Sequence, residues 1–172
     1  MPLPKIRVGV NVVIPGHTAA HNISGLRDEN VQIQPAGIDL TVQKVFTFLS
    51  GSRIGFRTKE ISLVEEVKPE EGAWSLRPGA YKIRFNEVVK VPENQVALCF
   101  PRSSLLRSGV ELKCTVWDPG YVGRGEGLLT IYNPYGAVIE VGARVAQLVF
   151  FRLYERPVKV YEGTYLGENI DS

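Results

Sequence analysis

Arg102, Ser103 and Ser104 have the residue types and the spacing of a phosphate-binding segment. They precede a short apolar pair, and Gly109 follows shortly after, a pattern that predicts a helix of one or two turns with a serine cap and a glycine stop. The N–H groups at such a helix start, two hydroxyls and one guanidinium could together bind a phosphate. Taken alone, the tripeptide is more often a capped turn whose arginine faces solvent.

A second segment, Asp118-Pro119-Gly120-Tyr121, would present a carboxylate and an aromatic ring from a tight turn. A carboxylate beside a bound phosphate can orient a water and accept its proton during in-line attack on phosphorus. Asp118 could instead be a turn residue that bonds its own backbone. Tyr121 could pack on the face of a sugar and leave no room for a 2′-hydroxyl, or it could cover the apolar face of the hairpin.

Asp39 and Gln147 are polar residues inside apolar, strand-like runs. The first run reads Ala36-Gly37-Ile38-Asp39-Leu40, and the second reads Gly142-Ala143-Arg144-Val145-Ala146-Gln147-Leu148. Individually, both residues are more often structural: Asp39 would close a turn, and Gln147 would pair with backbone in a covered strand.

The elements that must position these residues are short strands. Helical periodicity is nearly absent, and runs rich in Val, Ile, Phe and Tyr alternate with Gly, Pro and Asn turn signals. We predict strands at residues 5–14, 38–48, 61–66, 80–91, 95–100, 110–117, 127–133, 137–141, 145–153 and 157–162. Strands of this number and spacing predict an all-β sandwich or jelly roll that forms one domain. The run from Val145 to Phe151 is so continuously apolar that a second sheet or another subunit should cover it.

Composition restricts the class of partner. The 172-residue chain has a net charge of +2, with its basic residues dispersed, which does not favour nucleic acid or a membrane surface as a partner. No apolar run approaches the ~20 residues that span a bilayer. Cys99 and Cys114 are too few for a disulfide framework, so we expect buried thiols in a reduced, cytoplasmic setting. Zinc ligation by these cysteines with His17 and His21 is the alternative.

The four segments occur in one order between residues 36 and 148 and together resemble the dUTPase / dCTP deaminase superfamily. The resemblance implies a distorted jelly roll (the dUTPase-like β-clip) and a homotrimer with nucleotide sites at the subunit interfaces. It also implies Mg²⁺ as the cofactor of a deoxynucleoside triphosphate substrate. The single domain would span residues 1–172, with residues 154–172 forming a C-terminal tail that can cover the active site.

The same resemblance assigns roles to individual residues. Arg102, Ser103 and Ser104 would hold the α- and β-phosphates, Asp118 would activate the attacking water, and Tyr121 would select deoxyribose. Asp39 would bind Mg²⁺ through a metal-bound water, because Mg²⁺ usually keeps several waters. Gln147 would bond the phosphates or those waters, whereas Arg144 is a weaker candidate, with a packing or interface role.

Two chemistries share this scaffold: hydrolysis of dUTP to dUMP and pyrophosphate, and deamination of dCTP. Deaminases carry a glutamate in a Leu-Glu-apolar-x-Asn pattern where this chain has Thr130, and threonine cannot shuttle the proton. Arg107, by contrast, is typical of deaminases and of bifunctional relatives. Glu126, in a Gly-flanked turn, could supply the carboxylate that Thr130 lacks. Thr164 and Glu168 replace a Lys and a Gln of the deaminase tail.

The sequence therefore favours a dUTP diphosphatase most similar to the archaeal type. A dCTP deaminase or a bifunctional enzyme is the first alternative. A trimer that binds the nucleotide without turning it over is the second, and a jelly-roll structural or sugar-binding module is the third.

Overall fold

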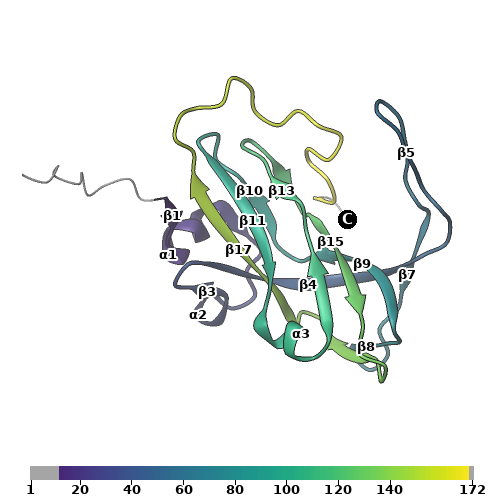
Figure 1. Ribbon diagram of the computed structural model, residues 1–172. Helices are drawn as coiled ribbons and strands as arrows, with labels where there is room; N and C mark the ends of the chain where they lie inside the picture. The colour runs from purple at the N-terminus through teal and green to yellow at the C-terminus, as the bar shows by residue number, and fades with distance from the viewer. Residues whose placement is uncertain (1–11, 171–172) are drawn as a thin grey trace, which may run out of the picture.

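The computed structural model describes residues 12–170, whose architecture is almost entirely β (Figure 1). The strands are β1 Val13–Ile14, β2 Ile23–Ser24, β3 Ile33–Gln34, β4 Gly37–Phe48, β5 Arg53–Ile54, β6 Lys59–Glu60, β7 Val64–Val67, β8 Ala73–Leu76, β9 Gly79–Phe85, β10 Val88–Lys90, β11 Gln95–Pro101, β12 Val110–Lys113, β13 Val116–Trp117, β14 Val122–Gly123, β15 Glu126–Ile131, β16 Ala137–Glu140 and β17 Arg144–Arg152. The helices are α1 Gly16–Ala19, the 3-10 helix η1 Ala20–Asn22, α2 Glu29–Gln32 and α3 Ser103–Arg107.

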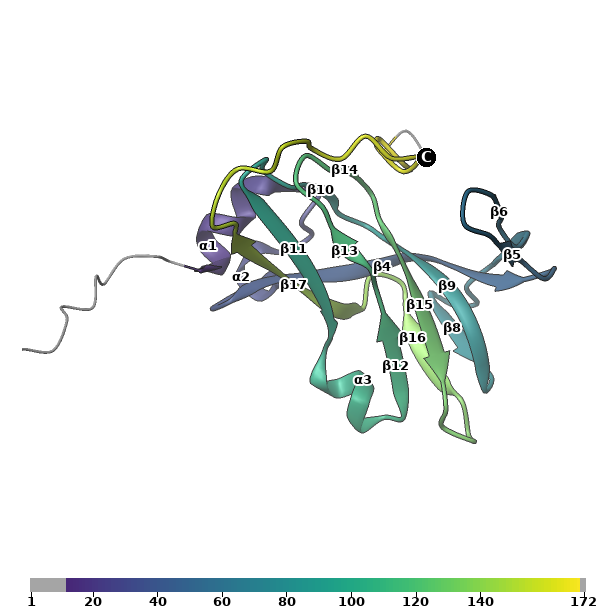
Figure 2. The same cartoon turned by 45° about the horizontal axis from the view of Figure 1, so that its top comes forward.

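The main sheet curls until its two edges meet. Its strand order is β12-β15-β9-β4-β17-β11-β13, yet the end strands β12 and β13 are separated in sequence only by Cys114 and Thr115. The chain passes from one edge of the sheet to the other across those two residues, which requires the curved, half-barrel shape seen in Figure 2. We call this junction, where residues 112–117 lie beside β11, the seam.

Alternate residues of the central strands point into the curl and form the core. They are fully or almost fully buried: Ile38, Leu40, Ile83, Phe85, Leu129, Leu148 and Phe150. Each such side chain contributes about 1.5–3 kcal/mol relative to exposure. The predicted all-β class and jelly-roll-like architecture are therefore confirmed.

β17 lies in the middle of the sheet, paired with β4, β11 and β1. Val145, Leu148 and Phe150 face the core, whereas Val149 and Phe151 on the opposite face are only half-buried. The chain itself thus covers one face of this strand completely and the other in part.

Most predicted strands occur, with informative differences. The predicted strand 80–91 is two strands, β9 and β10, because the chain turns at Asn86 and Glu87, and 110–117 is broken at the seam into β12 and β13. The predicted strand 157–162 is wrong, because that segment is a loop whose contact with the sheet includes the Tyr161 N–H donating to the Pro119 carbonyl (2.7 Å). Most of the predicted strand 5–14 lies outside the described residues.

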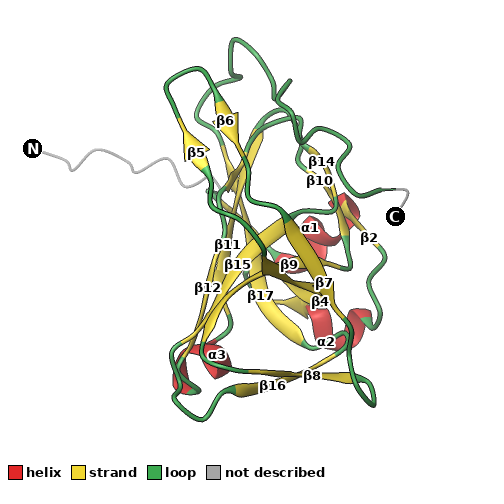
Figure 3. Ribbon diagram, turned by 90° about the vertical axis from the view of Figure 1, so that its right-hand side faces the viewer, coloured by secondary structure: helices red, strands yellow, loops and turns green. Residues whose placement is uncertain are grey.

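The sequence did not indicate several short elements. The arm formed by β5 and β6 projects from the body, and β8 pairs with β16 at the end of the molecule near α3 (Figure 3). Helices α1 and α2 are one turn each, too short to give a periodic signal. No helix among the described residues is long and apolar enough to cross a membrane.

Helix α3 forms where the sequence predicts it, but not with the predicted cap. Arg102 occupies the N-cap position and Ser103 is the first helical residue, and no side chain caps the helix start. Gly109 has φ of +70°, the left-handed conformation expected of a glycine that ends a helix.

Candidate active site

The polar residues predicted for phosphate and metal binding gather at the α3 end of the sheet. The Asp39 carboxylate forms ion pairs with Arg102 (3.1 Å) and Arg144 (3.2 Å) through the same oxygen, Oδ2. Gln147 lies directly opposite Asp39 in the β17–β4 register, so the two side chains share one face of the sheet. We call Arg102, Arg144, Asp39 and Gln147 the arginine cluster.

The arginine cluster combines a buried anion with two accessible cations. The side chain of Asp39 is 2% exposed, whereas those of Arg102 and Arg144 are 31% and 32% exposed. Burial raises the pKa of Asp39, while the two guanidinium groups act to lower it. With Asp39 ionised, the cluster carries a net charge of +1, with donors left over for an anion. Arg144, expected only to pack or to contact a partner, is therefore integral to it.

Helix α3 adds hydroxyls beside this cluster. Ser103, Ser104 and Arg107 are exposed. Ser104 and Arg144 both line a pocket of about 400 Å³ between α3, β16 and the start of β17. The structure therefore brings together the predicted phosphate-binding residues, together with Asp39 and Gln147.

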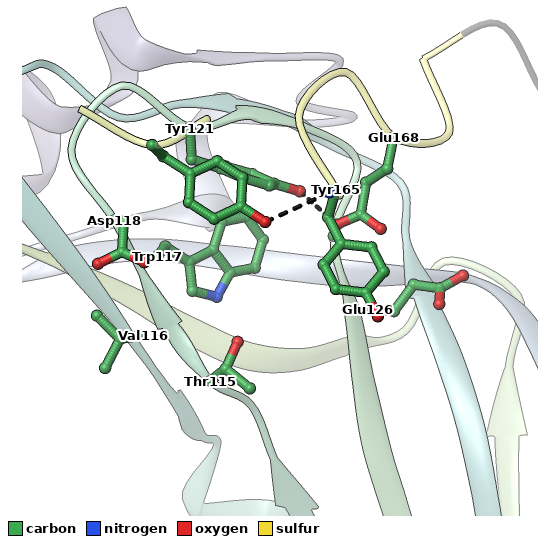
Figure 4. Close-up of a pocket in the computed structure, with 10 residues that line it drawn as sticks. Thr115, Val116, Trp117, Asp118, Tyr121, Glu126, Tyr165 and Glu168 are labelled. Carbon is green, nitrogen blue, oxygen red and sulfur yellow. Dashed lines mark hydrogen bonds between the residues drawn. The ribbon is translucent and has the colours of Figure 1, made fainter. Parts of the chain in front are cut away.

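Asp118 lies in a different pocket, at the hairpin that joins β13 to β15. This pocket, of about 340 Å³, is lined by Thr115, Val116, Trp117, Asp118, Tyr121, Gly125, Glu126, Tyr161, Tyr165 and Glu168 (Figure 4). We call it the hairpin pocket. Its walls are aromatic, and the charged side chains that line it are the acidic Asp118, Glu126 and Glu168.

Asp118 begins the tight turn that the sequence predicts. The Tyr121 N–H donates to the Asp118 carbonyl (3.1 Å), and Gly120 has φ of +85°. The Asp118 side chain is exposed, and no donor among the described residues reaches its carboxylate. The turn is thus closed by backbone alone, which leaves the carboxylate available for a ligand.

Tyr121 is more enclosed than a sugar-binding ring should be. Its side chain is 6% exposed, and its ring makes edge contacts with Trp117 (5.2 Å between centroids) and Tyr161 (5.8 Å). Its hydroxyl donates to Glu168 (2.8 Å). Burial, followed by the bond to Glu168, raises the pKa of Tyr121 far above its usual value. Contact with a sugar would require residues of the tail to move.

The C-terminal tail closes over the hairpin through several backbone bonds. The Gly167 N–H donates to Val122 (2.7 Å), and the Arg124 N–H donates to the carbonyl of Glu168 (2.9 Å). Figures 1 and 2 show this segment, in yellow, crossing above β13 and β14. Lys59 from the β5–β6 arm donates a hydrogen bond to the Thr164 hydroxyl (3.2 Å). Lys59 thus places a cation beside Thr164, the residue that replaces a lysine of the deaminase tail.

Glu126 is not in a turn, contrary to our expectation. It begins β15, forms ion pairs with Lys82 (2.8 Å) and Arg84 (3.3 Å), and lines the hairpin pocket opposite Asp118 (Figure 4). Thr130 lies four residues further along β15, about 14 Å away at the usual rise per residue. The structure therefore does not bring Thr130 into the hairpin pocket.

The arginine cluster and the hairpin pocket are far apart in one chain. Ala97 pairs with Trp117 beside the pocket, and Arg102 lies five residues further along the β11 direction. At about 3.3 Å per residue the separation is roughly 17 Å. The two pockets have no lining residue in common.

Glu87 is a buried polar residue that sequence reasoning missed. It is fully buried and accepts hydrogen bonds from Gln32 Nε2 (2.8 Å), Thr41 N (2.9 Å) and Thr41 Oγ1 (2.6 Å). Gln32 also donates to the Asp39 carbonyl (2.9 Å), so this network fixes the backbone beneath the arginine cluster. Burial raises the pKa of Glu87, against the effect of these bonds. The only signal in the sequence is a carboxylate inside the run 80–91, which was predicted to be one strand.

No group of three or more His, Cys, Asp or Glu side chains suited to a metal occurs among residues 12–170. The zinc alternative, which needs Cys99, Cys114, His17 and His21 together, is therefore wrong.

Comparison with known proteins agrees with this geometry. Residues 17–153 match the dCTP deaminase-like family. The chain is 42% identical over 162 residues to a probable deoxyuridine 5'-triphosphate nucleotidohydrolase of Aeropyrum pernix, covering 94% of this chain and 98% of that protein. It is 41% identical to the Archaeoglobus fulgidus protein of the same name over 146 residues, 84% of this chain and 86% of the relative.

Among solved structures, 2'-deoxycytidine 5'-triphosphate deaminase from Agrobacterium tumefaciens shares the fold, with a TM-score of 0.64 and 20% identity. The match covers 82% of this chain, which spans about half (48%) of that protein. The order of the motifs, the curled sheet and the extent of these matches lead to one conclusion: the chain belongs to the dCTP deaminase-like family, in which its curated relatives at 34–42% identity are named probable deoxyuridine 5'-triphosphate nucleotidohydrolases.

Proposed function

We propose that this protein is a dUTP diphosphatase that hydrolyses dUTP to dUMP and pyrophosphate in the cytoplasm. The observation that carries the proposal is the exposed Asp118 carboxylate at an aromatic-walled pocket, on a hairpin whose β15 strand bears Thr130 instead of a glutamate. The aromatic walls suit a base and a sugar. The names of the relatives support the same substrate.

Asp118 acts as the general base. Its carboxylate accepts a proton from a water aligned with the α-phosphorus, the water oxygen bonds to phosphorus, and the bond to the bridging oxygen breaks with pyrophosphate leaving. Arg102, Arg144, Ser103 and Ser104 stabilise the charge on the phosphates, since charge-assisted hydrogen bonds from guanidinium groups match phosphate oxygens. Arg107 and Gln147 extend this set, and Tyr121 limits the sugar to deoxyribose once the tail shifts.

Mg²⁺ enters bound to the triphosphate, as part of the substrate. The described residues offer no cluster of carboxylates to hold the ion, whereas the phosphates supply oxygens that it prefers. Asp39 would accept a hydrogen bond from water around the Mg²⁺–triphosphate, without binding the ion directly. Its ion pairs with Arg102 and Arg144 both use Oδ2, which is compatible with Oδ1 in that role.

The site is completed by a second copy of the chain in a homotrimer. The acidic hairpin pocket repels a triphosphate, the arginine cluster attracts it, and roughly 17 Å separates them within one chain. Apposition of the hairpin of one copy and the arginine cluster of the next is a heterologous contact, which closes into a ring. The half-buried outer face of β17 would gain cover in the same assembly.

Two variants, each strongly impaired when dUTP is well below the wild-type KM, test both parts of this proposal under that condition. Asp118→Asn and Arg102→Ala chains, mixed after reversible dissociation, should regain about one quarter of wild-type dUTP hydrolysis, because random assembly pairs an intact hairpin with an intact arginine cluster at one site in four. Sites built within single chains would give no recovery. Wild-type protein that releases no pyrophosphate from dUTP, or that hydrolyses all common deoxynucleoside triphosphates equally, would contradict the assigned substrate.

A second activity, deamination of dCTP, is favoured by one observation: Glu126 lines the hairpin pocket. Its carboxylate is engaged in ion pairs with Lys82 and Arg84 and would have to leave them to reach a bound base, so we rank this activity second. Ammonia release from dCTP that disappears in Glu126→Gln would establish it.

A further inference from the structure

Cys99 and Cys114 meet at the seam of the sheet, although they are 15 residues apart in sequence. Their sulfur atoms lie 3.1 Å apart. Cys99 lies on β11, and Cys114 lies between β12 and β13, where the chain crosses from one edge of the sheet to the other. Both thiols pack against the core and are partly accessible.

The seam is a short join at the edge of the main strand order. Only two residue pairs join β11 to β13, Ala97 with Trp117 and Leu98 with Val116, whereas seven pairs join β11 to β17. A covalent bond between Cys99 and Cys114 would hold β11 to the β12–β13 junction beyond the end of that short ladder.

On the β15 side, no side chain crowds the Cys114 sulfur. Gly127 on β15 faces this site, and a Cβ added there would lie 2.9 Å from Leu112 Cδ1 and 3.3 Å from the Cys114 sulfur. A disulfide needs its sulfurs at about 2.05 Å, an approach of roughly 1 Å from their present separation. A shared metal is not an alternative, since the described residues contain no group of three metal-binding side chains.

We propose that Cys99 and Cys114 form a reversible intrachain disulfide that fastens the seam. This inference rests on the fold and not on the proposed function. The bond would enclose α3 and β12, and it would fix both β11, which leads into Arg102, and the segment that leads into Asp118.

Thiol–disulfide exchange with a small disulfide such as oxidised glutathione supplies the oxidant. The Cys114 thiolate attacks one sulfur of the reagent, whose S–S bond breaks and releases one thiolate. Cys99 then loses its proton and attacks the Cys114 sulfur, which forms the new bond and releases the second thiolate. The cysteines are oxidised, the reagent is reduced to two thiols, and the two cysteine protons end on those thiols.

Cys114 is the attacking thiol in this sequence, and Cys99 resolves the mixed disulfide. The contact with Cys114, together with burial, raises the pKa of Cys99, so its thiolate is scarce until the mixed disulfide forms beside it.

The test uses the full chain equilibrated with oxidised glutathione or with a reductant, then unfolded in an alkylating agent. Before alkylation, the intact mass of the oxidised sample should be lower by two hydrogens. After alkylation, neither cysteine should carry the label, and a digest should contain one peptide pair linked through Cys99 and Cys114. The oxidised form should also melt roughly 5–10 °C higher, from the loop entropy removed by a crosslink across 15 residues. Cys114→Ala and Cys99→Ala are matched controls in which this difference in melting temperature should vanish.

Three results would overturn the proposal. In the first, both cysteines can still be alkylated after oxidation. In the second, glutathione stays on Cys114 as the end product. In the third, the disulfide joins two chains. Because each protein is compared with its own reduced form, a variant that is less stable does not confuse the outcome. dUTP hydrolysis is not a readout, so failure here leaves the proposed function untouched.

Discussion

The arginine cluster and the hairpin pocket differ in charge, in burial and in how each is held. The cluster consists of two accessible guanidinium groups around one buried carboxylate, braced from below by the Glu87 network. The hairpin pocket has an exposed catalytic candidate, Asp118, between aromatic walls, and part of its rim is a tail held largely by backbone hydrogen bonds.

In the proposed site, this difference would divide the labour between the two regions. A rigid, positively charged region suits phosphate binding, because its donors are fixed before the ligand arrives. An aromatic pocket suits selection of base and sugar, and a tail held largely by backbone hydrogen bonds would have to shift to admit them. Substitutions in the two regions should therefore affect different kinetic constants.

The largest expected effect is on Asp118. Asp118→Asn keeps the shape of the side chain and removes its basic lone pair, so kcat for dUTP should fall by ~10²–10⁴-fold while KM changes little or improves. Affinity can improve because the carboxylate repels the phosphates in the ground state. Steady-state kinetics with a pyrophosphate assay measures both constants. Near-normal turnover would move catalysis elsewhere, with Glu126 the next residue to replace.

Arg102→Ala should act in the opposite sense, on binding as well as rate. Loss of charge-assisted hydrogen bonds to phosphate should raise KM for dUTP by about 10–100-fold. The fold should persist, because Asp39 keeps its ion pair with Arg144. Arg102→Lys, which keeps the charge but not the planar guanidinium, is the matched control and should be intermediate. An unchanged KM would remove Arg102 from the phosphate site.

Glu87→Gln tests whether the rigidity of the arginine cluster depends on its buried support. The new amide would turn a donor toward existing donors, so we expect a loss of about 1–3 kcal/mol in the free energy of unfolding. Burial raises the pKa of Glu87 in the folded state, so at pH values above 4.5, the ordinary glutamate pKa, the folded protein binds a proton that the unfolded chain releases. The free energy of unfolding should therefore fall as the pH rises above 4.5.

Denaturant unfolding of wild type and Glu87→Gln over a pH series would show this dependence in the wild type and a weaker one in the variant. Parallel pH profiles would contradict the assignment of that dependence to Glu87.

The smallest effect is expected at Tyr121. Tyr121→Phe keeps the ring contacts with Trp117 and Tyr161 and removes the hydrogen bond to Glu168. The tail should open more often, and hydrogen exchange at the Gly167 and Arg124 amides should speed up by about 3–10-fold, the equivalent of one hydrogen bond. Amides of β17 serve as the internal control. Unchanged exchange in the tail would show that its backbone bonds alone hold it.

Local features were predictable because they depend on neighbouring residues. The turn at Asp118-Pro119-Gly120 and the end of α3 at Gly109 both occur as predicted, since Pro fixes φ and both glycines have positive φ. The predicted serine cap of α3 is wrong: Arg102 occupies the N-cap position, and local pattern does not resolve the boundary among adjacent polar residues. Residues 157–162 have the apolar residues of a strand but form a loop, bonded to the hairpin through the Tyr161 N–H and the Pro119 carbonyl.

The sequence by itself determined the all-β class, the turns that punctuate it and the residue types that suit a nucleotide. Only the tertiary structure decided which of those residues meet: Asp39 with Arg102 and Arg144, Glu126 with Lys82 and Arg84, and Cys99 with Cys114. These pairs depend on strand order and register across the whole curled sheet. Register follows from burying one face of every strand at once, a collective condition that no short segment specifies.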